Sequence, residues 1–297
     1  MNFDELLKPV PELFFEKSGE PRDADILLFG APLDVTASYR GGSRFAPTAI
    51  REASQYMESY SVRTGLDWDD LKLVDIGDVA EVGEVEPAIE NIRRVVEEIT
   101  ALGKLPAMLG GEHTITLGAL RALRPEAVVV FDAHLDLRDT LFDERLCHAT
   151  YLRRAHEEQD FKLVIVAARA LSGEEVEYTE EKGVTVVTAR DVKRFGVEPV
   201  LEMIRDTLED AESIYLSVDM DAIDPAEAPA VGNPSPEGID VTQLLDLTTG
   251  IIDRRLVGFD LNEVSPSYDS GLTAIQAAYI CLEILYVIQN RVKRILK

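Results

Sequence analysis

Short runs of consecutive apolar residues recur along the 297-residue chain, and in most of them hydrophobic and polar positions do not alternate. Such uninterrupted runs are typical of strands that are buried on both faces of a sheet. The pattern predicts eight strands: Ile26–Gly30, Leu73–Ile76, Leu105–Leu109, Val128–Phe131, Leu163–Ala167, Val184–Val187, Ile214–Val218 and Leu256–Leu261.

Segments with apolar residues at helical spacing lie between most of these runs. They are Pro47–Met57, Ala88–Leu102, Thr116–Leu123, Ala149–Glu158, Glu174–Lys182, Pro199–Glu209 and Val241–Ile252. Alternating strands and helices predict βαβ units and a mainly parallel sheet with helices on both faces. No long linker, low-complexity stretch or charge block divides the chain. We therefore expect a single three-layer αβα domain of α/β class over residues 1–297, with residues 1–24 as an N-terminal extension.

The segment Gly271–Asn290 is apolar and about long enough to cross a membrane. It carries Gln276, Glu283 and Gln289, however, and basic residues follow it, which favours a buried C-terminal helix. The first residues are acidic and broken by prolines, and they lack the basic region and apolar run of a signal peptide. We expect no membrane partner.

Composition narrows the class of partner. With 46% hydrophobic residues the chain can fill a core, which argues against disorder. A formal net charge of −25 repels nucleic acid phosphates and attracts small cations, although it is equally compatible with plain solubility. Two cysteines, Cys147 and Cys281, indicate neither a disulfide framework nor a thiolate zinc site. We expect a cytoplasmic protein that does not bind nucleic acid.

Four acid- or histidine-bearing segments follow predicted strands at their carboxyl ends. They are Leu109–Thr114 (LGGEHT), Asp132–Asp136 (DAHLD), Ser217–Pro225 (SVDMDAIDP) and Asp260–Pro266 (DLNEVSP). Ligands of open α/β sheets bind at the carboxyl ends of the strands. The four segments are therefore expected to meet in one site.

The DAHLD segment places three metal-capable side chains two residues apart, directly after an apolar run. If the strand continues, Asp132, His134 and Asp136 share one face. The alternative is a polar turn at the end of the strand. Asp219 and Asp221 repeat the same spacing after another predicted strand.

Histidines support a metal site at these strand ends. Three of the four in the chain, His113, His134 and His148, lie in or beside the acid-rich segments, whereas His156 is expected at an exposed helical position. Several carboxylates in one pocket repel one another unless cations neutralise them. Imidazole and carboxylate ligands without thiolates favour Mn²⁺ or a similar first-row ion over a structural zinc.

Together these motifs resemble the ureohydrolase family, the arginases and agmatinases. The resemblance rests on GGEHTITLG, DAHLDLRD, SVDMDAIDPAEAPAVGNPSPEG and DLNEVSP, together with YRGGSRFAPTAIREAS at Tyr39–Ser54. It runs from about residue 25 to the C-terminal helix. The family has an arginase-like αβα fold, and the resemblance also implies a homo-oligomer, a trimer or a hexamer.

The resemblance implies two Mn²⁺ ions per chain. One ion would be held by His113, Asp132, Asp136 and Asp219, and the other by Asp132, His134, Asp219 and Asp221. Asp132 and Asp219 would bridge the two ions. The reaction it implies is hydrolysis of a guanidinium group to urea and an amine, with water activated between the metals. His148 would shuttle a proton to the leaving amine, Glu263 would receive the guanidinium N–H groups, and Asp136 is also assigned to catalysis.

The segment LRDTLFDERLCHAT, before and around His148, bears on the substrate. It lacks the serine- and asparagine-rich cluster expected of arginases, and Asp139, Asp143 and Glu144 suit a cationic tail. This favours agmatine, a precursor of putrescine in polyamine biosynthesis.

The two arginines of this segment support a different substrate. Arg138 and Arg145 could hold a carboxylate, as guanidinobutyrate or formiminoglutamate would require, or could pair with neighbouring acids. Arg138 and Asp139 are therefore candidate substrate-binding residues beside His148 and Glu263.

Several alternatives stay open at this point. Arginine is one further substrate, a zinc deacetylase-like amide hydrolase is a second possibility, and a non-catalytic scaffold on the same fold is a third. The segment APAVGNPSPEG departs from the family pattern APGTGTPxPGG at Ala230, Val231 and Glu237. Loop shape near the substrate is therefore expected to differ from that of other members.

Overall fold

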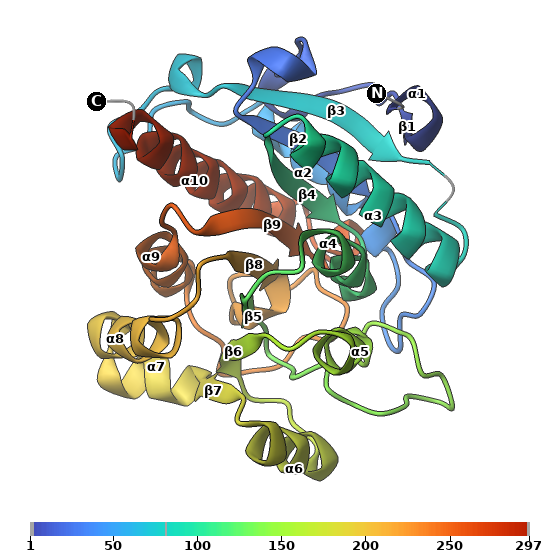
Figure 1. The fold of residues 1–297 in the computed structure, drawn as a ribbon, viewed down its shortest axis with the longest axis vertical. Helices are drawn as coiled ribbons and strands as arrows, with labels where there is room; N and C mark the ends of the chain where they lie inside the picture. The colour runs from blue at the N-terminus through green and yellow to red at the C-terminus, as the bar shows by residue number, and fades with distance from the viewer. Residues whose placement is uncertain (1–2, 81, 296–297) are drawn as a thin grey trace.

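The computed structural model describes residues 3–80 and 82–295. Within them nine strands form one sheet, in the order β1-β3-β2-β4-β9-β8-β5-β6-β7 (Figure 1). The strands are β1 (Leu7–Lys8), β2 (Ile26–Ala31), β3 (Leu73–Val79), β4 (Leu105–Gly110), β5 (Ala127–Phe131), β6 (Lys162–Ala168), β7 (Thr185–Thr188), β8 (Ile214–Asp219) and β9 (Leu256–Asn262). Strands β2 to β9 pair in parallel, and β1 pairs antiparallel with β3. The mainly parallel α/β sheet is confirmed.

Helices cover both faces of the sheet (Figure 1). They are α1 (Phe3–Leu6), α2 (Ala46–Ser54), α3 (Val85–Ala101), α4 (Thr116–Leu123), α5 (Tyr151–Glu158), α6 (Gly173–Lys182), α7 (Ala189–Phe195), α8 (Val197–Thr207), α9 (Val241–Ile251) and α10 (Leu272–Ile295). One apolar core joins α2, α7, α8, α9 and α10 to the sheet, and a second joins α1, α3, α4, α5 and α6 to the other face.

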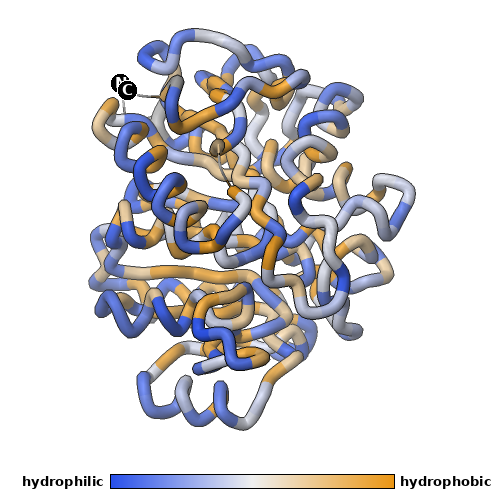
Figure 2. The backbone as a smooth tube through the Cα atoms, turned by 90° about the vertical axis from the view of Figure 1, so that its right-hand side faces the viewer, coloured by the Kyte–Doolittle hydropathy of each residue, from blue (hydrophilic) through white to orange (hydrophobic). Residues whose placement is uncertain are grey.

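Strand β5 shows why its apolar run is uninterrupted. Val129 and Phe131 belong to the first core, whereas Val128 and Val130 belong to the second, and all four are fully buried. Both faces of the strand therefore need apolar side chains. Figure 2 shows the same pattern as apolar strand segments that run through the middle of the molecule.

The described residues contain three α-helices or strands that the apolar pattern did not predict, namely α1, β1 and α7. Strand β1 has only two residues beside a proline-rich segment, so no apolar run marks it. Helix α7 begins at a capping box, in which Thr188 and Asp191 exchange side-chain and backbone hydrogen bonds. His156, expected to be exposed, is partly buried, and its ring packs against that of Phe161.

Helix α10 is the long apolar helix that could span a membrane by length alone, but 78% of its apolar window is buried inside the protein. Its polar side chains find protein partners. Glu283 accepts a hydrogen bond of 2.8 Å from Ser61 Oγ, and Gln289 bonds to the backbone of Lys72 and to Asp25. The expected buried C-terminal helix is confirmed.

Candidate metal centre

The predicted site residues meet at the carboxyl ends of four neighbouring strands. His113 opens a 3₁₀ turn after β4, and Asp132 follows β5. Asp219 ends β8 and Asp221 lies in the turn after it, while Glu263 follows β9. The sheet order β4-β9-β8-β5 makes these strand ends adjacent.

Two tight turns, and not a continued strand, bring the acids together. Strand β5 ends at Phe131, and Asp136 has a left-handed φ of 52°, so of the two possibilities the polar turn is present and the continued strand is not. Instead, Asp132 Oδ1 accepts the backbone N–H of His134 at 2.6 Å. Asp219 Oδ1 accepts that of Asp221 at 2.7 Å in the same way. Each turn leaves the second carboxylate oxygen free to face the site.

The six predicted ligands form two adjoining groups. His113 Nδ1 lies 3.1 Å from Asp132 Oδ2 and 3.4 Å from Asp136 Oδ2 and from Asp219 Oδ2. His134 Nδ1 lies 3.0 Å from Asp221 Oδ2 and 3.5 Å from Asp132 Oδ1. Asp132 thus takes part in both groups, with one oxygen toward each histidine.

Hydrogen bonds behind His113 fix the proton on its ring. Ser217 Oγ donates to Asp260 Oδ1 at 2.6 Å, so its oxygen is an acceptor for His113 Nε2 at 2.8 Å. Tyr151 Oη also lies 2.8 Å from Nε2. Nε2 then carries the hydrogen, and Nδ1 keeps a free lone pair.

Two buried atoms of the site fit a cation. His113 Nδ1 and Asp132 Oδ2 face each other but form no hydrogen bond within the described residues. Buried polar atoms are rarely left without a partner, and these two are electron-rich. A divalent cation between them would satisfy both, and nitrogen and oxygen donors suit a first-row metal.

Without a cation the site retains protons. Burial, with Asp132 nearby, raises the pKa of Asp136 to about 7, and burial raises the pKa of Asp219 well above its usual value. Burial acts to lower the pKa of His134, but the carboxylates of Asp221 and Asp132 raise it to about 12. Bound cations would replace these protons as the positive charge of the site.

Glu263 lies beside the first group. Its Oε1 accepts the backbone N–H of His113 at 2.7 Å, and its own φ is 64°. Gly232 borders the other oxygen, because a Cβ there would lie 3.1 Å from Glu263 Oε2. Burial raises the pKa of Glu263 to about 8, although the His113 N–H bond acts against this shift.

His148 is buried next to the ligand groups without belonging to them. Its Nδ1 lies 3.2 Å from Thr36 Oγ1, and its Nε2 lies 3.2 Å from Ser38 Oγ. Burial lowers its pKa below the usual value. A cavity of about 530 Å³ borders this region and is lined by Thr36, Phe142 and Cys147, among others.

The two arginines that could have held a carboxylate are paired with acids. Arg138 Nε lies 3.9 Å from Glu175 Oε2, and Arg145 Nη2 lies 3.6 Å from Asp139 Oδ1. Asp139 also accepts a hydrogen bond of 2.9 Å from Arg154 Nη2, so its charge is not free either. The roles of Arg138 and Asp139 in substrate binding stay predictions.

Arg169 is a residue of the site that sequence reasoning missed. Its guanidinium donates to the backbone carbonyls of Asp221 at 2.7 Å, Ala222 at 3.2 Å, Ser235 at 2.8 Å and Pro236 at 3.0 Å. It therefore ties the turn that carries Asp221 to the loop before α9. No motif marks Arg169, because its partners are far away in sequence.

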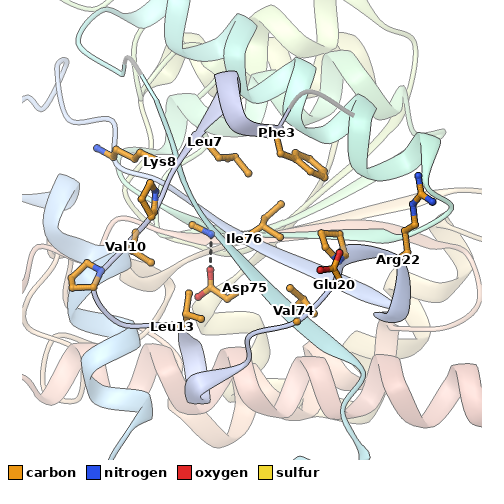
Figure 3. Close-up of a pocket in the computed structure, with 15 residues that line it drawn as sticks. Phe3, Leu7, Lys8, Val10, Leu13, Glu20, Arg22, Val74, Asp75 and Ile76 are labelled. Carbon is orange, nitrogen blue, oxygen red and sulfur yellow. Dashed lines mark hydrogen bonds between the residues drawn. The ribbon is translucent and has the colours of Figure 1, made fainter.

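The structure also contains a larger cavity, away from the candidate metal centre. It measures about 990 Å³ and lies between the N-terminal segment and β3, lined by Phe3, Leu7, Val74 and Ile76, among others (Figure 3). It contains none of the predicted site residues.

Comparisons with known proteins identify the family of this chain. A family model described as the arginase family matches residues 24–286. An agmatinase of Pyrococcus horikoshii is 36% identical over 90% of this chain and 92% of the relative. A guanidinobutyrase of Pseudomonas aeruginosa is 36% identical over 91% of this chain and 88% of the relative. A solved agmatine ureohydrolase of Thermoplasma volcanium superposes with a TM-score of 0.89 at 35% identity, over 96% of this chain and 97% of that one.

Proposed function

This chain belongs to the arginase family, and from that premise we propose that it hydrolyses agmatine to putrescine and urea. One observation carries the proposal. The carboxylate of Asp132 is shared by two groups of metal-capable side chains, and Glu263 lies beside them. A guanidinium carbon is a poor electrophile, so its hydrolysis requires a strongly activated water and a firmly held substrate.

We assign two Mn²⁺ ions to the site because its donors are nitrogen and oxygen without thiolate. When bound, the ions supply Lewis-acid activation of a water molecule. One ion would be held by His113, Asp132, Asp136 and Asp219, and the other by Asp132, His134, Asp219 and Asp221.

Glu263 is the residue that we assign to the guanidinium group of the substrate. Its carboxylate is fixed by the His113 N–H, and Gly232 leaves room at Oε2. A carboxylate matches the planar N–H donors of a guanidinium and orients them. The raised pKa of Glu263 falls again when a cationic group arrives, because an opposite charge favours the ionised carboxylate.

His148 is the residue that we assign to proton transfer. The amine leaves readily only if its nitrogen gains a proton, which an imidazole can hold and deliver near neutral pH. His148 is only 8% exposed, so it would work in a pocket largely closed to water.

The charged side chains in the segment before His148 favour a substrate with a cationic tail. Arg138 and Arg145 are each paired with an acid, so neither is a free cation for a carboxylate. Asp143 and Glu144 are exposed and form no ion pair within the described part of the chain. Agmatine would bring an ammonium group to these acids, whereas arginine would also bring a carboxylate.

A panel of four substrates tests the proposal. We expect kcat/KM for agmatine to exceed that for arginine at least about tenfold, which requires only about 1.4 kcal/mol. Guanidinobutyrate and formiminoglutamate complete the panel, and the amine product of each is measured at low and high salt. The preference should shrink as salt rises, because exposed charges are screened within roughly 10 Å at 0.1 M. Equal rates for agmatine and arginine would contradict the substrate assignment.

Guanidinobutyrate is the second candidate substrate. A guanidinobutyrase matches this chain at the same 36% identity as an agmatinase, so overall similarity does not separate the two. Arg138 is 38% exposed on its side chain and its guanidinium lies 3.9 Å from its acid, so it could turn toward a carboxylate. A guanidinobutyrate preference that is lost in Arg138→Ala would favour this alternative over agmatine.

A further inference from the structure

The loop after β2 holds both ring nitrogens of His148. Thr36 Oγ1 lies 3.2 Å from Nδ1 and also accepts the backbone N–H of His148 at 3.0 Å. Ser38 Oγ lies 3.2 Å from Nε2. The orientation of the imidazole is therefore set by a segment more than one hundred residues away in sequence.

Glu112 in turn fixes this loop. It is 1% exposed, and its two oxygens together accept four hydrogen bonds. Oε1 accepts from Thr36 Oγ1 at 2.8 Å and from Thr114 Oγ1 at 2.7 Å. Oε2 accepts from the backbone N–H groups of Val35 at 2.6 Å and Thr36 at 2.7 Å. The carboxylate is thus an acceptor in each of these contacts. Its partners lie in the loop after β2 and in the turn after β4.

The directions of these hydrogen bonds show which ring nitrogen of His148 carries a hydrogen. A threonine hydroxyl has one hydrogen and two lone pairs. Thr36 gives that hydrogen to Glu112, so its oxygen can only accept from His148. It accepts the backbone N–H and, at 3.2 Å, Nδ1–H. Nε2 is then the nitrogen with a free lone pair, and it faces Ser38.

We propose that Thr36 and Glu112 are positioning residues that hold His148 in its Nδ1–H tautomer, so that Nε2 is the atom that takes and gives the proton. This inference rests on the proposed function. When Nε2 binds a proton, the Nδ1–H bond to Thr36 remains, and the negative charge of Glu112 faces the imidazolium through Thr36. When Nε2 gives the proton to the leaving amine, neutral His148 returns to the same tautomer. Only one proton moves between His148 and the amine: the Nδ1–H bond to Thr36 remains, and Ser38 changes from donor to acceptor when Nε2 is protonated.

Nuclear magnetic resonance of the isotope-labelled imidazole nitrogens tests the tautomer without any substrate. The chain has only four histidines. We suggest loading the protein with Zn²⁺, which is diamagnetic, and assigning His148 by its disappearance in His148→Ala. We expect Nδ1–H in the wild type and in Thr36→Ser, and a mixture of tautomers in Thr36→Val. An Nε2–H tautomer in the wild type, or an unchanged spectrum in Thr36→Val, would overturn the proposal.

Kinetics test whether the tautomer matters. Thr36→Val keeps the side-chain shape without the hydroxyl, and we expect kcat to fall about tenfold to a hundredfold while KM changes less than about threefold. Thr36→Ser should restore most of the lost kcat. Thr248→Val is the matched control, because the buried Thr248 hydroxyl bonds only to its own helix, 2.9 Å from Leu244 O. Metal per chain should equal wild type in all three variants.

Glu112→Gln is the second variant, in case Thr36→Val does not fold. A glutamine amide cannot accept all four donors, so kcat should again fall more than KM changes. Wild-type kcat in folded Thr36→Val, or a Thr36→Ser variant as slow as Thr36→Val, would exclude the relay. If wild-type protein releases no amine from any of the four guanidino or formimino compounds, the proposed function fails, and the imidazole spectrum still decides the tautomer.

Discussion

At the residue scale, the orientation of a ligand can depend on partners that lie behind it. His113 is the clearest case, because Ser217 accepts from its Nε2 and passes its own hydrogen to Asp260. Asp260 is fully buried and also accepts from Tyr215 Oη at 2.7 Å and from Thr116 Oγ1 at 2.9 Å. The orientation of one imidazole thus rests on a buried carboxylate two hydrogen bonds away.

We predict that Ser217→Ala weakens metal binding about tenfold to a hundredfold, the usual cost of removing a partner behind a metal ligand. Without Ser217 the ring of His113 loses the acceptor that keeps Nδ1 free for the metal. Titration with metal in a calorimeter measures the change in affinity. Ser213→Ala is the control, because its hydroxyl accepts the backbone N–H of Glu126 next to the first residues of β5 and β8, at the opposite ends of these strands from the site. Equal affinity in Ser217→Ala and wild type would show that Tyr151 alone orients His113.

Sequence reasoning found the candidate ligands but not their supports. Acids and histidines that follow apolar runs stand out, so His113, His134 and Asp219 were predicted from residue type and spacing. Ser217 and Thr36 are ordinary polar residues, and their importance arises from contacts across 104 and 112 positions. No local pattern encodes such contacts.

At the element scale, a single guanidinium holds the turn that carries Asp221 to a neighbouring loop. Arg169 follows β6 and bonds to the turn after β8 and to the loop before α9. The carbonyl of Ala222 also accepts the backbone N–H of Ile239, but those of Asp221 and Ser235 have no further partner within the described residues. A shorter or less branched side chain would therefore leave carbonyls unpaired. The planar fork of arginine suits several acceptors at once, and the single ammonium of lysine does not.

We predict that Arg169→Lys lowers the free energy of unfolding by about 1–3 kcal/mol and weakens binding at the ion that Asp221 would hold. Denaturant unfolding and metal titration measure the two effects. Arg205→Lys is the matched control, since Arg205 bonds to one carbonyl, that of Gly250, at an exposed position. A variant that matches the control in both measurements would contradict the role of Arg169.

Most elements could be predicted, and the ones that were missed, α1, β1 and α7, are short. Long apolar runs mark strands that are buried on both faces, such as β5 and β8. Strand β1 pairs at the sheet edge and has only two residues, so burial leaves no pattern in it. The segment that carries Asp132 was left open between a continued strand and a turn, because alternating residues satisfy both geometries until φ is known.

At the scale of the whole molecule, cations and protons compete for one buried site that joins four strands. When no metal is bound, the raised pKa of His134, about 12, keeps its proton at neutral pH, whereas the raised pKa of Asp136, about 7, means that it gains a proton as the pH falls below neutral. Metal binding must displace protons that are held there, so a higher pH favours the metal-bound protein. Binding only to the folded chain raises its stability by RT ln(1 + [L]/Kd), about 2.7 kcal/mol when the metal is at one hundred times Kd.

We predict that Mn²⁺ raises Tm by several degrees, that chelation reverses the shift, and that the shift grows between about pH 6 and about pH 8. Asp132→Ala should abolish most of it, because that carboxylate belongs to both groups. Asp143→Ala, at an exposed acid outside both groups, should keep the full shift. Calorimetric melts with and without metal give the result, and a shift independent of pH would contradict proton displacement.

The two tight turns that carry Asp132 and Asp219 have an evolutionary consequence. Each turn is closed by a hydrogen bond from a backbone N–H to the side chain of the aspartate two residues earlier, and neither bond uses a residue of the loops around the substrate. Mutations in those loops can therefore accumulate without dismantling the reactive centre. A lineage with such turns is free to exchange one substrate for another while it retains its chemistry. Relatives named for different substrates and equally distant from this chain are what such a lineage would leave.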